Sequence, residues 1–76
     1  MVREHERVVL KTAVLEHGLM DGDVGTVVHV YPGGKAYEVE FVALNGETAA
    51  VATLKASQIR PVERLEITHA RQLAIA

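Results

Sequence analysis

The chain has 76 residues, with eight Lys or Arg against ten Asp or Glu and a formal net charge of −2. This length suits one domain, and a chain of this size buries only roughly 60% of its unfolded surface. The absence of cysteine excludes disulfides, thiolate metal sites and thiol catalysis. The N-terminus is charged and no apolar run approaches the roughly 20 residues of a membrane span, so we expect a cytoplasmic protein without a membrane segment.

The first predicted strand covers residues 7–10, which are rich in β-branched side chains. The polar lead over residues 1–6 is expected to fray, as chain ends do unless something holds them. After the strand, residues 13–17 fit a single helical turn. Gly18 would end that turn by adopting the left-handed conformation that other residues resist.

Glycine then marks a sharp reversal into a second strand. Gly22 and Gly25 lie where the backbone needs a positive φ or a close approach to a neighbouring strand. The strand itself is predicted over residues 26–31. Pro32 and Gly33 follow, and this pair favours a type II turn because proline presets φ and glycine supplies a positive φ after it.

The return strand over residues 36–42 alternates apolar and acidic side chains, which predicts one face in the core and one in water. Asn45 and Gly46 come next, and this dipeptide between two apolar runs is typical of a two-residue type I′ hairpin turn. The partner strand is therefore expected over residues 48–54. The predicted core side chains of the return strand are Tyr37, Val39 and Phe41, and the solvated ones are Glu38 and Glu40.

Residues 55–58 have room for one helical turn, and residues 59–62 read as a short last strand with an edge proline. These elements predict a mainly β fold, a small five-stranded SH3-like barrel over residues 1–62. Over residues 63–76 the apolar period changes, which predicts a short C-terminal helix as a separate extension. The apolar side of that helix would carry Ile67, Ala70, Leu73 and Ala74.

Three parts of the chain also carry a resemblance to a known family. They are the run from Gly22 to Tyr31, the run from Tyr37 to Val42 with Gly46 and Leu54 after it, and the run from Ile59 to Val62. In spacing they resemble the bacterial family called domain of unknown function 4926. The resemblance implies a small SH3-like barrel with no assigned activity. It also raises a toxin-neutralising or accessory-subunit role, because family members resemble small partner-type proteins.

No arrangement of residues predicts a metal, a cofactor or a catalytic centre. The histidines are scattered along the chain with no two at ligand-pair spacing. Asp21 and Asp23 straddle Gly22, where aspartate ordinarily hydrogen-bonds its own turn. Glu38 and Glu40 lie side by side like an acid and base pair, but nothing near them in sequence would raise a carboxyl pKa. We therefore expect a protein that is not an enzyme.

The favoured hypothesis is a protein-binding or self-associating module with an unknown protein partner. Tyr31 is a candidate for a binding face, and the stripe of Ile67, Ala70, Leu73 and Ala74 would form either a lid on the barrel or the seam of a homodimer. An exposed strand edge offers a second route to a homodimer.

Two alternatives remain. A nucleic-acid-associated barrel is disfavoured by the net charge and would need the basic side chains to converge on one face. A small hydrolase, the weaker alternative, would use Glu38, Glu40 or His29 and would need a concave pocket that such a barrel has little room to form. The basic residues that the nucleic-acid alternative would need on one face are Arg3, Arg7, Lys11, Lys35, Arg60 and Arg64.

Overall fold

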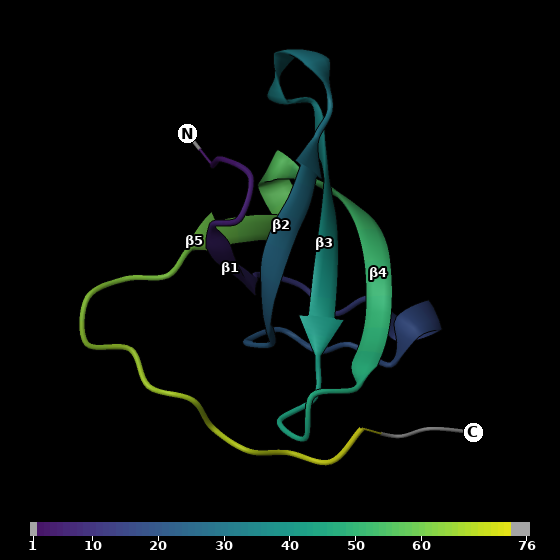
Figure 1. The fold of residues 1–76 in the computed structure, drawn as a ribbon, viewed down its shortest axis with the longest axis vertical. Helices are drawn as coiled ribbons and strands as arrows, with labels where there is room; N and C mark the ends of the chain where they lie inside the picture. Colours follow the sequence, from purple (N-terminus) through teal and green to yellow (C-terminus); the bar gives the residue numbers. More distant parts are fainter. Residues whose placement is uncertain (1, 74–76) are drawn as a thin grey trace.

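The computed structural model describes residues 2–73 and shows a mainly β domain built on one five-stranded antiparallel sheet (Figure 1). The strands follow the order β4-β3-β2-β1-β5. Strands that are consecutive in sequence therefore lie side by side from β1 to β4, whereas β5 lies beside β1 and not beside β4. The strands are β1 (Arg7–Leu10), β2 (Val24–Val30), β3 (Ala36–Val42), β4 (Thr48–Lys55) and β5 (Ile59–Pro61), and single 3-10 turns lie at η1 (Leu15–His17), η2 (Pro32–Gly34) and η3 (Ala56–Gln58).

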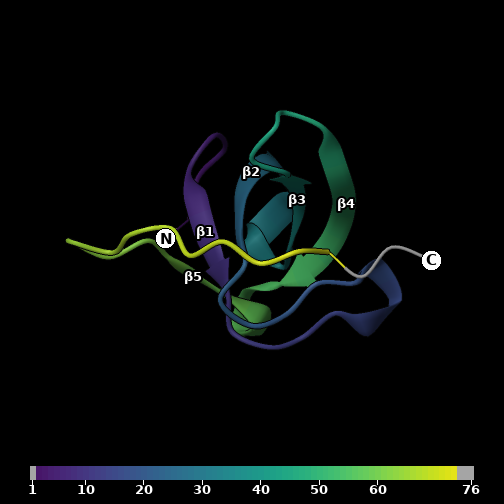
Figure 2. The same cartoon turned by 90° about the horizontal axis from the view of Figure 1, so that it is seen from below.

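The predicted number of strands is confirmed, but the predicted barrel is wrong in one respect, because the sheet does not close. β4 and β5 form its two edges, and neither pairs with the other. The lengths explain this, since β4 has 8 residues whereas β5 has 3. β5 also ends at Pro61, which has no amide hydrogen to continue a ladder. The result is a curved open sheet that wraps around the core (Figure 2).

The predicted C-terminal helix is also wrong for the part of the chain that the structure describes. Residues 62–73 form no helix, and they run as an irregular segment, here called the tail, across the lower end of the sheet (Figure 1). Leu65 has a φ of 65°, a left-handed conformation that breaks a helix. A helix this short is marginal in water by itself. Ala74, a member of the predicted stripe, lies outside the described residues.

The core is entirely apolar within residues 2–73, where no polar or charged residue is buried. The alternation predicted for β3 is confirmed, because Tyr37, Val39 and Phe41 face inward. The same stretch holds no helix long and apolar enough to cross a membrane. The most deeply buried side chains are Leu10, Leu19, Leu54, Val8, Val27 and Val39.

Two glycines act as the sequence predicts, each in a different way. Gly22 has a φ of 93°, which serves the reversal before β2. Gly25 is packed directly under β3, so that a Cβ atom there would lie 2.6 Å from Val39 Cγ1 and 2.9 Å from Phe41 Cε2. A side chain at residue 25 would therefore push β2 and β3 apart.

Of the two predicted hairpin turns, the structure confirms one and differs from the prediction at the other. The type II turn is confirmed, because Gly33 has φ 75° and ψ 7° and the Gly34 N–H donates to the Tyr31 carbonyl at 3.0 Å. The type I′ turn is wrong, since Asn45 has no positive φ. Its side-chain oxygen accepts the N–H of Glu47 at 3.1 Å, and this Asx turn favours a three-residue loop that ends on Gly46.

The N-terminal lead, expected to fray, is held against β2. The His5 N–H donates to the Val27 carbonyl at 2.6 Å, and the Val27 N–H donates to the Glu6 carbonyl at 2.9 Å. Val2 is buried beside the core. These contacts extend the pairing of β1 backward by several residues.

On the other side of the molecule, β4 is the long edge of the sheet. Ala49 is skipped in its register with β3, which is a β-bulge near the start of the strand. From Thr48 to Leu54 the strand carries no charged residue, and Lys55 ends it.

Candidate binding groove

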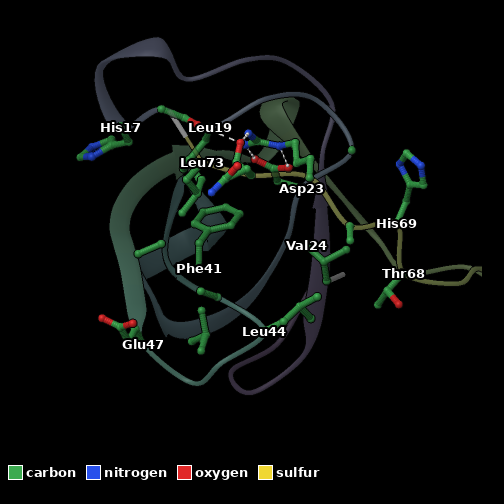
Figure 3. A pocket seen from close by; sticks show the side chains of 18 of the residues that line it. His17, Leu19, Asp23, Val24, Phe41, Leu44, Glu47, Thr68, His69 and Leu73 are labelled. Carbon is green, nitrogen blue, oxygen red and sulfur yellow. Dashed lines mark hydrogen bonds and ion pairs between the residues drawn. The ribbon is translucent and has the colours of Figure 1, made fainter. Parts of the chain in front are cut away.

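An open groove of about 1200 Å³ lies at the lower end of the sheet. Three segments enclose it: the η1 loop, the β3–β4 hairpin and the tail. Figure 3 shows Phe41 at its centre, with Leu19 and Leu73 beside it. Phe41 and Leu19 are buried core residues, so the floor of the groove is one end of the hydrophobic core. The sequence predicted no such hollow because it predicted a helix where the tail runs.

The rim of the groove carries three exposed apolar side chains among polar ones such as Glu47 and His69. Leu15, in η1, is 75% exposed, and Leu44, in the β3–β4 hairpin, is 82% exposed. Ile67 in the tail is 91% exposed and faces the groove from the third side. Contiguous exposed apolar groups around a hollow are typical of an interaction surface.

The tail is fixed over the groove by Arg71. Its Nε donates to Asp23 Oδ1 at 2.8 Å and its Nη2 donates to Asp23 Oδ2, a two-point contact between guanidinium and carboxylate. Nη2 also donates to the backbone carbonyl of Gly18 at 3.1 Å. Asp23 Oδ2 accepts the N–H of Met20 as well, at 2.8 Å. Asp23 therefore stabilises its own turn, as the sequence indicated, and in addition binds a residue far away in the sequence.

The pKa of Asp23 follows from these contacts. Partial burial of the carboxyl opposes ionisation and would raise its pKa, but the hydrogen bonds from Arg71 and from the Met20 N–H, together with the Arg71 charge, hold the pKa below its usual value. The same contact raises the pKa of Arg71. Both groups are therefore charged at neutral pH.

A second clamp holds the start of the tail. Arg60 donates to Glu66 with Nη1 to Oε1 at 2.9 Å and Nη2 to Oε2 at 2.7 Å. Glu66 Oε1 also accepts the N–H of Glu63 at 2.6 Å. The hydrogen bonds from Arg60 and Glu63 lower the pKa of Glu66 to about 2. This clamp lies outside the groove and shapes the turn that leads into it.

The predicted partner-binding residues separate into two places. Ala70 and Leu73 line the groove together with Ile67, so the structure brings the described part of the stripe to one site, though not on a helix. Tyr31 lies at the far end of β2, where its ring meets the ring of His29 edge-on at 4.7 Å between centroids. Tyr31 does not line the groove.

The residues proposed for a hydrolase lie on the outer face of the sheet, where His29 is opposite Glu38 in the register of β2 and β3. Glu38 and Glu40 face away from the core and are engaged by threonines of β4: Thr53 donates to Glu38, and Thr48 Oγ1 donates to Glu40 at 2.8 Å. His29 Nδ1 lies 3.9 Å from a carboxylate oxygen of Glu4. None of these side chains lines the groove.

No group of three or more potential ligands that could hold a metal ion occurs within residues 2–73. Among the basic side chains, Arg7 and Arg60 line one small hollow together. Arg60 is engaged by carboxylates of the tail, and Arg71 by Asp23. Lys35 lies beside the β2–β3 turn, at the opposite end of the sheet from the tail (Figure 1).

A family model matches most of the chain and assigns it no function. Residues 4–61 match the domain of unknown function DUF4926. The chain belongs to this family. No curated protein and no solved structure matches it. The DUF4926 match ends where β5 ends, so Asp23 and the groove floor lie within the family domain, whereas the tail lies beyond it.

The sequence carries no signal for the clamp between Asp23 and Arg71. The two residues are 48 positions apart. The turn chemistry around Asp23 accounts for that residue by itself, and Arg71 falls within the predicted C-terminal helix. A pairing of this kind becomes visible only once the tail is known to double back over the sheet.

Proposed function

We propose that this DUF4926 domain is a non-enzymatic protein-binding module whose groove takes an apolar segment of a partner protein. The observation that carries the proposal is the groove itself, an open hollow with a core phenylalanine as its floor and exposed leucines on its rim. We also infer that the domain is an open member of the SH3-like class. The strand order and the single turn η3 before the last strand support this placement.

The energetics favour an apolar ligand. Leu15 and Leu44 expose most of their side chains to water although both lie next to the open end of the core. Covering one such leucine contributes about 1.5–3 kcal/mol. A segment that bridges the two rims would gain from both. A site of this kind needs no ordered metal or acid–base pair.

The positions of the candidate catalytic groups agree with a binding role. Glu38, Glu40 and His29 lie outside the groove, so a molecule bound there would not meet them. A toxin-neutralising or accessory-subunit role would be a particular case of this proposal. In each case a small domain would cover an apolar segment of a larger partner.

The test compares two leucines of nearly equal exposure, one on the groove and one away from it. Leu44 is 82% exposed on the groove rim, and Leu65 is 80% exposed in the tail without lining the groove. Tagged full-length chain, as wild type, Leu44→Asp and Leu65→Asp, would be cross-linked in the organism that encodes it, and captured proteins would be quantified by mass spectrometry.

We expect a partner that the wild type and Leu65→Asp capture equally and that Leu44→Asp loses about ten-fold or more, since about 1.4 kcal/mol corresponds to ten-fold in affinity. Equal capture by all three proteins would remove the groove as the site. A wild type that captures nothing would contradict the protein-binding role.

A further inference from the structure

We propose that Asp23 and the Gly18 carbonyl form a guanidinium-binding subsite of the groove, which Arg71 occupies in cis as a self-inhibiting ligand. The partner that competes for it is an extended segment with an arginine two residues before an apolar residue. This inference rests on the proposed function of the groove and adds to it the chemistry of the ligand.

The subsite is built by the family domain rather than by the tail. Gly18 has a φ of 69° at the end of η1, and its N–H donates to the Leu15 carbonyl at 3.0 Å, so the direction of its own carbonyl is fixed locally. The Asp23 carboxylate is oriented by the N–H of Met20. Its side chain is only 18% exposed. Both acceptors therefore stand in place without help from Arg71.

These acceptors match a guanidinium better than an ammonium. Two carboxylate oxygens take two donors of one arginine fork, and the carbonyl of Gly18 takes a third hydrogen bond from the same group. A planar fork can satisfy all three acceptors at once, whereas a lysine amine is a point charge on a flexible stem. The geometry thus selects arginine.

An apolar subsite lies two residues further along the bound segment. Leu73 is half-buried, and Figure 3 shows it beside Phe41 and Leu19. In a drawn-out chain the side chains of residues i and i+2 point to the same side. Arg71 and Leu73 both line the groove, and Gln72 between them lines it as well but is exposed. The tail shows the pattern of a ligand: arginine, any residue, apolar residue.

The tail is suited to being displaced. Among the residues that the structure describes, none beyond Pro61 belongs to the buried core. Its two clamps are ion pairs near the surface, a class of contact that contributes little to stability in water. As a tethered ligand it acts at an effective concentration on the order of millimolar. A free segment must therefore outcompete it, which would confine binding to segments that fit both subsites.

Binding of a labelled peptide tests the proposal in the full-length chain. The probe is a fluorescein-labelled peptide with the sequence of residues 66–73, and fluorescence anisotropy measures its affinity. We expect Arg71→Ala to bind it about two- to five-fold more tightly than the wild type, because the tethered competitor loses a contact that contributes up to about 1 kcal/mol. Adding Asp23→Asn to Arg71→Ala should abolish that gain. The matched control adds Asp21→Asn instead, which changes a neighbouring exposed carboxylate and should leave the gain intact.

Variants of the probe keep the proposal testable even if Asp23→Asn disturbs the turn. A peptide with lysine in place of its arginine, and one with serine in place of its leucine, should each bind Arg71→Ala at least about five-fold more weakly, since they lose the fork or the apolar anchor. Equal affinity of the wild type and Arg71→Ala for the probe would overturn the proposal. So would full affinity of the lysine peptide.

The mass of the wild type in sedimentation identifies the occupant. A monomer agrees with Arg71 bound in cis. A dimer that Asp23→Asn converts to a monomer would place Arg71 on a second copy and overturn the self-inhibition. Failure of this inference is separate from failure of the proposed function: if Leu44→Asp still loses a captured partner while the peptide shows no arginine dependence, the groove stands and only the subsite falls.

Discussion

The sheet domain and the tail are held by opposite kinds of force. Residues 2–61 form a core in which every buried residue is apolar, and no ion pair is needed to close it. The tail over residues 62–73 adds nothing to that core and is attached by two arginine–carboxylate clamps. The family match covers the first region and stops at its end. The fold of the sheet therefore depends on one kind of interaction and the position of the tail on another, so that one can change without the other.

This separation follows from the size of each contribution. Burial of aliphatic side chains contributes about 1.5–3 kcal/mol for each large residue. Exposed ion pairs contribute about 0–1 kcal/mol, and the gain disappears when the carboxylate is protonated. A change inside the sheet should therefore affect the whole molecule, whereas a change at a clamp should affect only the tail.

The largest effect is expected from Gly25→Ala. The new methyl group would lie within 3 Å of Val39 and Phe41, so β2 and β3 must shift apart. Overpacking of this kind costs about 1–3 kcal/mol, or about 5–20 °C in melting temperature for a domain of this size. Thermal unfolding followed by circular dichroism measures it. Gly33→Asn is the control, because a Cβ there meets only Lys35 at 3.8 Å or more and asparagine tolerates the left-handed conformation.

A melting temperature of Gly25→Ala within about 2 °C of wild type would contradict the tight contact between β2 and β3. It would also weaken the contrast between the two regions, since the sheet would then tolerate a change in its most crowded position.

An intermediate effect is expected from acid, which should free the tail before it unfolds the sheet. The pKa values of Asp23 and Glu66 are lowered in the folded chain, to about 2 for Glu66. The stabilisation from such an ion pair is complete at any pH above the carboxyl pKa of an unfolded chain. It is lost as the pH falls through the lowered pKa of the folded chain. Amide chemical shifts of residues 67–73, followed from pH 7 to pH 2, should stay constant to below pH 4 and then move toward those of a free chain.

Shifts of the β2 and β3 amides report on the sheet in the same titration and should change less over that range. Release of the tail between pH 5 and pH 4 would show that the carboxyls titrate at ordinary values and that the clamps are not formed in solution.

The smallest effect is expected from Glu66→Gln. The variant removes the charge that pairs with Arg60 but leaves Arg71 on Asp23. The melting temperature should change by about 3 °C or less, because the pair is exposed. Amide shifts of residues 63–66 should change and those of residues 68–73 should not. Glu16→Gln, in the η1 turn, is the matched control for the loss of one surface charge.

The sequence predicts the sheet well because local chemistry and the fold agree there. Alternation along β3 assigns the core face, while Gly22 marks the reversal before β2 and Gly25, within β2, marks the crowded contact. The errors come from effects beyond the local sequence. Asn45 hydrogen-bonds to Glu47 and selects a longer loop, and the short β5 leaves the sheet open. A helix was the better local choice for the tail, yet Arg60 and Asp23 supply partners that a helix would forgo.

The groove could not be predicted from the sequence because each of its walls comes from a different segment. Leu15, Leu44 and Ile67 look like unrelated surface residues along the chain, and only the doubled-back tail places them around Phe41. The described part of the predicted apolar stripe does reach the groove. These residues reach the groove because the tail lies over the end of the core, and not because they form one face of a helix.

The edge of β4 has a consequence for handling the protein. Natural edge strands are usually guarded by charge, proline or distortion, because unpaired amides attract other strands. Here the bulge at Ala49 and the charge of Lys55 guard the two ends, while the stretch between them is neutral and rich in alanine. Concentrated stocks and refolding mixtures are thus the conditions in which fibrous deposits should start, and a lysine placed midway along that strand is the natural remedy.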